Sequence, residues 1–336
     1  MTQLNTLLLD DISQAAAILR GGGLVAFPTE TVFGLGADAT NADALARLFA
    51  AKGRPSDNPL IVHVDVVDHW PKVARAMPKV AERLLARFAP GPLTVVLPKH
   101  LSICDSVTAG LDTVGLRIPN HPQARSLLAA AGVPIAAPSA NRSGLPSGTT
   151  WQTVLEDLDG RIDAVLRGST CSIGIESTVV DCVGALPRLL RPGAIGLAEL
   201  RTVAPELIGC MADDACDSTA NSPGLRHPHY QPTAAVHLVE SASEADQKMK
   251  RQPKSATQLE QHLANCAYCG LEDSKLTAYL GASRRFGSVE EYAREFYEFM
   301  RVVDRLGIQN LFCQRPTTLG IGAALNDRLS RAASPK

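Results

Sequence analysis

The sequence predicts a two-domain α/β protein, in which a larger domain precedes a smaller domain with a parallel sheet. Three observations lead to this prediction. Short apolar runs alternate with amphipathic segments along most of the chain, which is typical of strand–helix alternation. The length of 336 residues exceeds that of an average single domain. Between Val203 and Ser222 the composition becomes acidic, small and polar, as expected of a linker.

Residues 21–36 form the first part of the most informative stretch. Residues 24–27 are apolar and are expected to form a short buried strand, which Pro28 ends. Polar residues 29–31 (Thr, Glu, Thr) follow at its carboxyl end. Gly34 and Gly36 are expected to permit tight turns. Open α/β sheets bind ligands at the carboxyl ends of strands, so a site is expected here.

Residues 40–64 complete this strand–helix–strand unit. Thr40 or Asn41 is suited to cap a helix that runs to Lys52 and ends at Gly53. A second strand is expected at 60–64. Further helices are expected at 12–20 and 80–88, and further strands at 93–97, 113–118, 177–181 and 186–191.

Lys52 and Arg54 are separated by one glycine. Two cations held this close repel each other unless an anion lies between them, and phosphate or carboxylate suits both side chains. The alternative is a cationic helix C-terminus that only complements the helix dipole. Arg117 poses a similar question, because an arginine in an apolar strand needs a partner, either a bound carboxylate or water at a sheet edge.

Six motifs resemble those of the YrdC-like family, whose members include the threonylcarbamoyl-AMP synthases of tRNA modification. Residues 28–36 read PTETVFGLG and residues 52–60 read KGRPSDNPL, with Phe33 where the family commonly has Tyr. The other four are PSAN followed by SGLPSG (138–148), STVVD (177–181), RPGAI (191–195) and SPGLRHPHYQP (222–232). The last motif is typical of the two-domain form of the family.

The resemblance implies the roles of individual residues. The catalytic residues are expected to be Lys52, Arg54, Ser139 and Asn141. Threonine and bicarbonate are expected to contact Thr31, His63, Arg117, Ala137 and Ser177. ATP is expected to contact Arg54, Asn58, Thr113, Ser139, Ser147, Arg191 and Tyr230. In the linker, Arg226 and His229 are further candidates for phosphate contacts.

The resemblance also implies the reaction. The enzyme is expected to be a nucleotidyltransferase that makes threonylcarbamoyl-AMP and pyrophosphate from L-threonine, bicarbonate and ATP. Mg²⁺ is expected to be held mainly by the phosphates, with no protein metal site. A downstream tRNA threonylcarbamoyl transferase complex would use the product, so the enzyme itself need not bind tRNA directly.

The resemblance implies three regions. A YrdC-like catalytic domain with a twisted mixed sheet is expected at 1–207, a linker that closes over the nucleotide at 208–233, and a small Rossmann-like parallel α/β domain at 234–336. In the last region, strands are expected at 236–239, 276–280 and 308–312. Ser288 should cap a long helix with an apolar stripe that reaches Leu306, and a final helix is expected at 319–329. Residues 240–275 match the family poorly.

Composition limits the other functional classes. A net charge of -1 gives no global basic field for nucleic acid. There is no apolar run long enough to span a membrane and no signal-peptide pattern, so a cytoplasmic protein is expected. Eight scattered cysteines suggest reduced thiols. Cys266 and Cys269 form a single CxxC, and a structural zinc site would need further ligands.

Three alternatives remain open from the sequence. A carbamoyl-adenylate enzyme of hydrogenase maturation would share the catalytic fold, but would also carry an acylphosphatase domain and zinc fingers. A double-stranded RNA-binding module is disfavoured by the net charge. A catalytically silent relative would have lost the KxR or SxN residues, and both are present.

Overall fold

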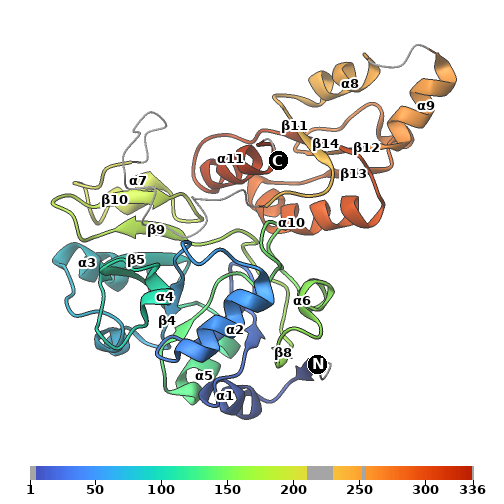
Figure 1. Cartoon of the computed structure of the whole chain (residues 1–336). Helices are drawn as coiled ribbons and strands as arrows, with labels where there is room; N and C mark the ends of the chain where they lie inside the picture. Colours follow the sequence, from blue (N-terminus) through green and yellow to red (C-terminus); the bar gives the residue numbers. More distant parts are fainter. Residues whose placement is uncertain (1–4, 210–229, 252–254, 335–336) are drawn as a thin grey trace. The chain divides into compact units, whose positions relative to one another are not determined.

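The computed structural model describes residues 5–209, 230–251 and 255–334. The chain divides into two compact units, one made of Met1–Ser143 with Ser147–His227 and the other of Gly144–Pro146 with Pro228–Lys336 (Figure 1). No helix among the described residues is both long and apolar enough to cross a membrane.

The first unit is built on a ten-stranded mixed sheet with the order β1-β8-β2-β3-β7-β4-β6-β5-β9-β10. Its strands are β1 Leu7–Leu9, β2 Val25–Phe27, β3 Gly34–Asp38, β4 Ile61–His63, β5 Leu93–Pro98, β6 Thr113–Arg117, β7 Ile135–Ala136, β8 Ala164–Leu166, β9 Thr178–Asp181 and β10 Arg188–Arg191. Strands β4 and β6 are parallel, whereas β5 runs antiparallel to β6 and parallel to β9. The carboxyl ends of β4 and β6 therefore lie side by side.

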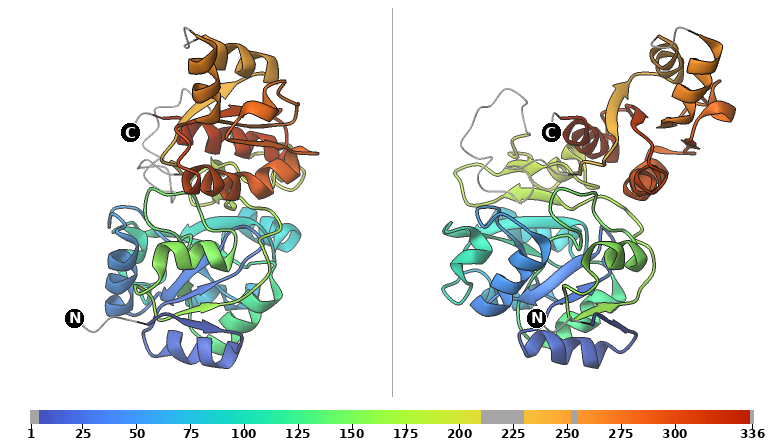
Figure 2. Two further views of the ribbon diagram at one scale, coloured as in Figure 1. Left: turned by 90° about the vertical axis from the view of Figure 1, so that its right-hand side faces the viewer. Right: turned by 45° about the vertical axis from the view of Figure 1, so that its right-hand side comes forward.

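Helices cover both faces of this sheet (Figures 1 and 2). The helices are α1 Ile12–Arg20, α2 Ala42–Lys52, η1 Val67–Lys72, α3 Lys79–Phe88, α4 Asp105–Thr108, α5 Pro122–Ala131, α6 Trp151–Leu158 and α7 Leu197–Arg201. The larger core contains the buried faces of α2 and α3. A second core packs α1 and α5 against the opposite face of β2, β7 and β8. His63 of β4 is paired with Ile135 of β7 on one side and with Arg117 of β6 on the other. Since Ile135 belongs to the second core, His63 and Arg117 lie on the same face of the sheet as that core.

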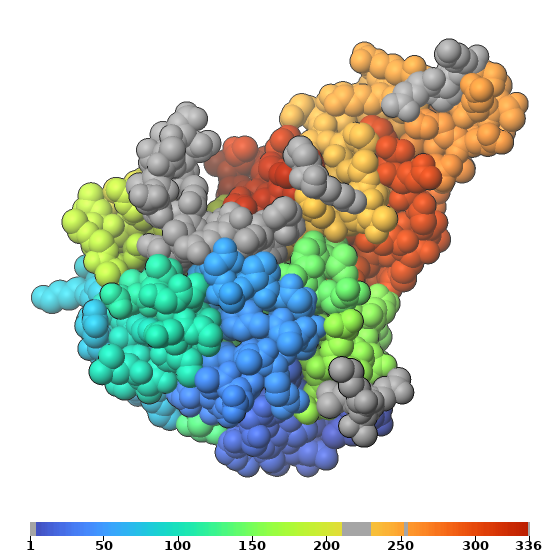
Figure 3. Space-filling model, viewed as in Figure 1, coloured from blue at the N-terminus to red at the C-terminus, as the bar shows by residue number. Residues whose placement is uncertain are grey.

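Local sequence explains where the first helices begin and end. The carboxylate of Asp11 accepts hydrogen bonds from the backbone N–H groups of Ser13 and Gln14 and caps α1. Asn41 caps α2 in the same way, and Gly53 ends it in a left-handed conformation with φ +60°. Both helices match the sequence prediction. In the space-filling view the outer side of α2, coloured blue, lies at the surface (Figure 3), whereas Lys52 at its end is buried.

The prediction of turns at Gly34 and Gly36 is wrong, because both glycines lie inside strand β3. β3 runs antiparallel to β2, with Gly36 opposite Val25. A Cβ atom at Gly36 would lie 3.0 Å from side-chain carbons of both Phe27 and Ile135. Glycine is therefore required by close packing within the sheet rather than by a turn.

The second unit is a three-layer α/β domain with an entirely parallel sheet in the order β11-β14-β12-β13. Its elements are β11 Ala235–Val239, α8 Ala242–Lys250, α9 Ala256–Ala264, β12 Cys266–Gly270, η3 Thr277–Tyr279, β13 Ala282–Arg285, α10 Val289–Arg305, β14 Asn310–Gln314 and α11 Ile321–Ala332. Helices α8 and α9 lie on one face, and α10 and α11 on the other (Figure 2). This confirms the predicted Rossmann-like class.

Two details of the second unit differ from prediction. Residues 276–280 do not form a strand: Thr277–Tyr279 is a turn of 3-10 helix, and the strand follows at Ala282–Arg285. The hydroxyl of Thr277 donates to the backbone oxygen of Ser274, a local bond that favours the turn. Leu306 is also not part of the buried stripe of α10, because it is 58% exposed just beyond the helix end.

Candidate active site

The four predicted catalytic residues come from two segments, the C-terminal end of α2 and the loop after β7. Lys52 ends α2, and its ammonium donates to the backbone carbonyls of Ser139 and Asn141 in the loop after β7. In that loop the hydroxyl of Ser139 donates to the amide oxygen of Asn141 at 2.5 Å. The backbone N–H of Ser143 in turn donates to the carbonyl of Lys52 at 2.9 Å. The KxR and SxN motifs are therefore hydrogen-bonded to each other.

The environment of Lys52 disfavours its charged form. The residue is only 3% exposed. Burial, together with the nearby guanidinium of Arg54, lowers the pKa of Lys52 well below its ordinary value, and Asp157 opposes this only in part. A bound anion would relieve both effects, because it would supply the negative charge that the site lacks.

Arg54 is held by the loop that follows it. Its Nε donates to the carbonyl of Asn58 at 3.3 Å, and its Nη2 to the carbonyl of Pro59 at 3.0 Å. Asn58 itself is fully buried. The fork of Arg54 is therefore positioned by the turn that the sequence NP predicts, close to Lys52.

A second group of predicted residues lies at the carboxyl ends of β4 and β6. His63 and Arg117 are paired across these strands, and both are buried. Ala137 follows β7, and its backbone N–H donates to Ile61 of β4 at 2.9 Å. Burial and the charge of Arg117 lower the pKa of His63 to about 3. The imidazole is consequently neutral near pH 7, a hydrogen-bonding group rather than a cation.

The segment after β2 connects the two groups. The hydroxyls of Thr29 and Thr31 lie 2.9 Å apart. The carbonyl of Thr31 accepts from the N–H of Gly174 at 3.0 Å, and that of Phe33 accepts from the N–H of Ala140 at 2.7 Å. The PTETVFG motif thus runs from the strand ends to the SxN loop.

Two residues of this neighbourhood have no role assigned from the sequence. The carboxylate of Glu30 forms an ion pair with Arg117 at 2.9 Å between Oε1 and Nη2, with both side chains about 5% exposed. The negative charge of Glu30 also acts to raise the pKa of His121, whereas burial lowers it. In the sequence, the position of Glu30 within the PTET motif is the signal that could have marked it as a site residue. No sequence pattern pointed to His121.

Hydroxyl groups line the neighbouring strands. Ser177, at the start of β9, lies 2.8 Å from Thr94 of β5, which is the residue paired with Arg117. Arg191 donates from Nε to the carbonyl of Ser177 at 3.1 Å and from Nη2 to its hydroxyl at 3.2 Å. The predicted threonine residue Ser177 and the predicted ATP residue Arg191 therefore touch.

The remaining predicted ATP residues are more dispersed. Ser147 is buried and donates to Glu176 at 2.7 Å. Thr113 begins β6, and the strand alternation places it on the same face as Arg117 but at the other end. Tyr230 belongs to the second unit, where its ring stacks on Tyr297. Arg226 and His229 lie outside the described residues.

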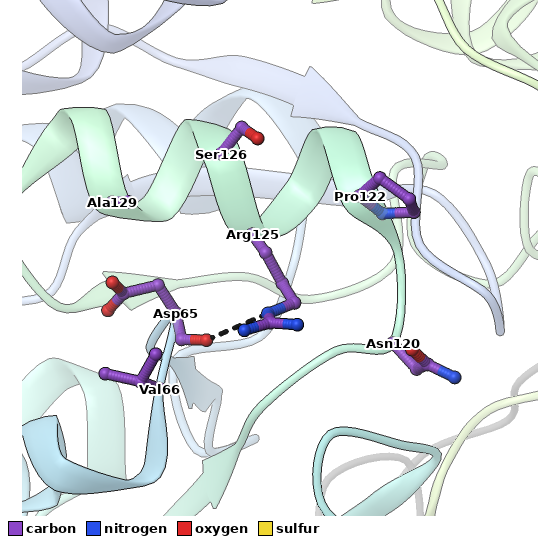
Figure 4. A pocket seen from close by; sticks show the side chains of 7 residues that line it. All are labelled: Asp65, Val66, Asn120, Pro122, Arg125, Ser126 and Ala129. Atoms are coloured by element: carbon purple, nitrogen blue, oxygen red, sulfur yellow. Dashed lines mark hydrogen bonds between the residues drawn. The ribbon is translucent and has the colours of Figure 1, made fainter.

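A surface cavity of about 430 Å³ lies beside these strand ends (Figure 4). In Figure 4, Arg125 of α5 points toward the loop after β4 and donates from Nε to the backbone carbonyl of Asp65 at 3.2 Å. The cavity is lined by Asp65, Val66, Asn120, Pro122, Arg125, Ser126 and Ala129. Since this lining contains no predicted site residue, the cavity is a neighbour of the site rather than the site itself.

Cys266 and Cys269 lie on β12, three residues apart, and so point to opposite faces of the sheet. Cys266 is 3.6 Å from His262, whereas Cys269 is 3.5 Å from Cys313. The two sulfurs of the CxxC therefore cannot bind one ion together. Within the described ranges, no cluster of three or more His, Cys, Asp or Glu side chains is arranged to hold a metal.

Comparisons with known proteins agree with this architecture. Residues 17–193 match the family model Sua5_yciO_yrdC, described as telomere recombination, and residues 195–334 match Sua5_C, described as threonylcarbamoyl-AMP synthase, C-terminal domain. The threonylcarbamoyl-AMP synthase of Bacillus subtilis is 40% identical over 96% of this chain and 92% of its own length. That of Pyrococcus abyssi is 40% identical over 95% of this chain and 93% of its own.

A solved structure extends the likeness to three dimensions. The crystal structure of P. abyssi Sua5 complexed with L-threonine matches with a TM-score of 0.85 at 38% identity, over 99% of this chain and 98% of that one. The chain belongs to the threonylcarbamoyl-AMP synthase family, in the two-domain form that carries the Sua5-type C-terminal domain.

Proposed function

We propose that the protein is an L-threonylcarbamoyladenylate synthase. It joins L-threonine, bicarbonate and ATP into threonylcarbamoyl-AMP and pyrophosphate, and the product supplies the N6-threonylcarbamoyl group of the tRNA adenosine next to the anticodon. Beyond the family relationship, one observation supports this most strongly. Lys52, next to Arg54, is hydrogen-bonded to the SxN loop, and the PTETVFG segment connects this loop to the buried residues around Arg117.

The side chains around Arg117 suit an amino acid. The guanidinium would bind the substrate carboxylate, and the hydroxyls of Thr31 and Ser177 would meet its polar groups. The amine of threonine attacks the carbon of bicarbonate, water leaves, and N-carboxythreonine forms. The new carboxylate then attacks the α-phosphorus of ATP, and pyrophosphate departs.

The cationic wall suits the adenylation step. Negative charge develops on the phosphate oxygens as pyrophosphate leaves, and fixed donors at Lys52, Arg54 and Arg191 would stabilise it without rearranging. Binding of ATP would also favour the charged form of Lys52, because the phosphates place negative charge beside it and oppose the lowering of its pKa by burial. No covalent protein intermediate is needed.

Magnesium is part of this proposal. Most of the side chains expected to contact the phosphates are cations, hydroxyls and amides, which match phosphate oxygens better than a divalent metal, although Asp157 acts on Lys52 and Glu176 accepts from Ser147. Mg²⁺ would therefore be held mainly by the phosphates, and when bound it neutralises charge on the leaving pyrophosphate.

Partners and location follow from the product. A transferase complex that acts on tRNA would use threonylcarbamoyl-AMP, so this protein need not bind tRNA directly, and the net charge of -1 is consistent with that. We place the protein in the cytoplasm for the same reason, because its substrates and its product's acceptor are found together there.

The test is pyrophosphate release measured with each amino acid, with and without bicarbonate. Threonine with bicarbonate should be fastest, serine slower and valine slowest. Valine should lose roughly a hundredfold or more, because a site that hydrogen-bonds the substrate hydroxyl leaves buried groups unpaired when it is missing. Equal rates for threonine and valine, or release that does not depend on bicarbonate, would rule the proposal out.

A further inference from the structure

Three buried side chains at the strand ends, together with the half-buried His121, contain buried polar atoms without a hydrogen-bond partner among the described residues. We call Glu30, His63, Arg117 and His121 the Arg117 cluster. Six of its buried atoms have no hydrogen-bond partner among the described residues: Oε1 and Oε2 of Glu30, Nδ1 of His63, Nε and Nη2 of Arg117, and Nδ1 of His121. Buried polar atoms are nearly always paired, so a ligand with complementary groups is expected to complete this cluster.

The open atoms of Arg117 define one half of that ligand. Nε and Nη2 form one edge of the guanidinium, and this edge binds both oxygens of a carboxylate. Neither atom has a hydrogen-bond partner among the described residues, although Nη2 forms an ion pair with Glu30, so the edge keeps hydrogen-bonding capacity for a substrate. The carboxylate of an amino acid fits it.

Glu30 defines the other half. Its Oε1 forms an ion pair with Nη2 of Arg117 at 2.9 Å, and neither carboxylate oxygen accepts a hydrogen bond from a described residue. In an α-amino acid the ammonium is attached to the carbon next to the carboxylate. An acceptor placed directly beside the carboxylate-binding edge is therefore in reach of the ammonium, and the adjacent cation and anion of the protein match the two charges of the zwitterion.

We propose that Glu30 is a catalytic residue that binds the ammonium of threonine and removes one of its protons. This inference rests on the proposed function and adds the group that makes the amine nucleophilic. The proton moves from the ammonium to the carboxylate of Glu30, which becomes neutral. The amine lone pair then forms the N–C bond with bicarbonate, the C–OH bond breaks, and the second amine proton leaves with that hydroxide as water. Glu30 later returns its proton to solvent.

The other titratable groups of the neighbourhood are weaker candidates. His63, with its pKa near 3, is a poor base. Arg117 is a permanent cation. Burial, with a smaller effect from the negative charge of Glu30, raises the pKa of Cys171 to about 12, so its thiol stays protonated. His121 is half-buried, and its lowered pKa leaves it as the one competing base near Glu30.

Binding measurements test the ammonium contact. Wild type and Glu30→Gln are titrated calorimetrically with L-threonine and with its analogue in which a hydroxyl replaces the α-amine. Wild type should prefer threonine by about 30-fold or more, as for a buried charge pair, and Glu30→Gln should lose most of this preference. If Glu30 were only a counterion of Arg117, Glu30→Gln would instead bind both compounds more tightly, and that result would overturn the proposal.

The pH profile tests the proton transfer. Turnover of Glu30→Gln at saturating substrates should rise about tenfold per unit between about pH 6 and 7.5, because only the free amine then reacts, whereas wild type should change little. Glu30→Asp should restore part of the rate. A flat profile for Glu30→Gln, or the new pH dependence in His121→Gln instead, would show that Glu30 is not the base.

Two controls separate the possible failures. Asp38→Asn removes another buried carboxylate of the same unit, one that accepts hydrogen bonds from Thr40, and should keep wild-type turnover and pH profile. Retained ATP binding and an unchanged melting temperature establish that Glu30→Gln is folded. If wild type itself releases no pyrophosphate with threonine and bicarbonate, the proposed function fails, whereas active wild type with an unaltered Glu30→Gln refutes only the role of Glu30.

Discussion

The ammonium of Lys52 donates a hydrogen bond to the backbone carbonyl of Ser139, 87 residues further along the chain. The same nitrogen also donates to the carbonyl of Asn141. One buried side chain therefore fixes the end of α2 against the SxN loop. It also carries a charge that its surroundings disfavour, and this combination leads to the first prediction.

Ala at Lys52 or Arg54 should lower turnover by roughly a hundredfold or more, because each removes a fixed donor to the transferring phosphate. Lys52→Ala should also lower the free energy of unfolding by about 1–3 kcal/mol, since two buried carbonyls lose their donor. Pyrophosphate release and urea unfolding measure the two effects. Lys79→Ala, an exposed cation at the start of α3, is the matched control. Wild-type turnover in both variants would contradict the assignment.

Stability should fall in acid through His63. Its folded pKa is about 3 and its ordinary value 6.5, so between these values the unfolded chain binds a proton that the folded protein does not. The free energy of unfolding should therefore decrease as the pH falls below 6.5, at up to about 1.4 kcal/mol per pH unit from this residue. Urea unfolding at several pH values between about 7 and 4 measures the slope.

His63→Gln should flatten this slope, because glutamine does not titrate. His100→Gln provides the control. The ring of His100 bonds to Ser102 in a surface loop, so this substitution should leave the slope as in wild type. Identical acid slopes for wild type and His63→Gln would mean that another group causes the loss of stability.

Gly193 should not tolerate a side chain. A Cβ atom there would lie 2.2 Å from the backbone nitrogen of Thr178, and backbone at that distance must move. Gly193→Ala should cost about 1–3 kcal/mol or more and weaken ATP binding, because Arg191 and Ser177 would separate. Thermal melts and ATP titrations measure the two effects. Gly184→Ala in the same hairpin has 3.6 Å to its nearest neighbour and should behave as wild type.

The hydroxyl of Tyr230 should matter separately from its ring. The ring is 4% exposed, stacks on Tyr297 at 5.4 Å and lies below the guanidinium of Arg328. Tyr230→Ala should therefore lower stability, contrary to what a linker residue would suggest from sequence alone. If the hydroxyl binds nucleotide, Tyr230→Phe should weaken ATP binding at an unchanged melting temperature. Equal ATP affinity in Tyr230→Phe and wild type would remove Tyr230 from the ATP site.

The sequence by itself determined what depends on local chemistry. Side-chain caps at Asp11 and Asn41, and the left-handed glycine at 53, set helix ends within one residue of prediction. The apolar periodicity of strands and helices established the α/β class of both units. The motif residues were also readable, because phosphate chemistry requires a recognisable set of cations, hydroxyls and amides.

Only the tertiary structure decided which residues are neighbours. Strand β3 was missed because its glycines add nothing to an apolar pattern. Glycine is favoured at Gly36 because side chains of Phe27 and Ile135, on other strands, pack close to it. In the sequence Glu30 is an ordinary polar residue after a strand. The structure shows that it is buried and forms an ion pair with Arg117. Whether a carboxylate is exposed and inert, or buried and left with open lone pairs, is set by long-range packing, and no local sequence pattern records that.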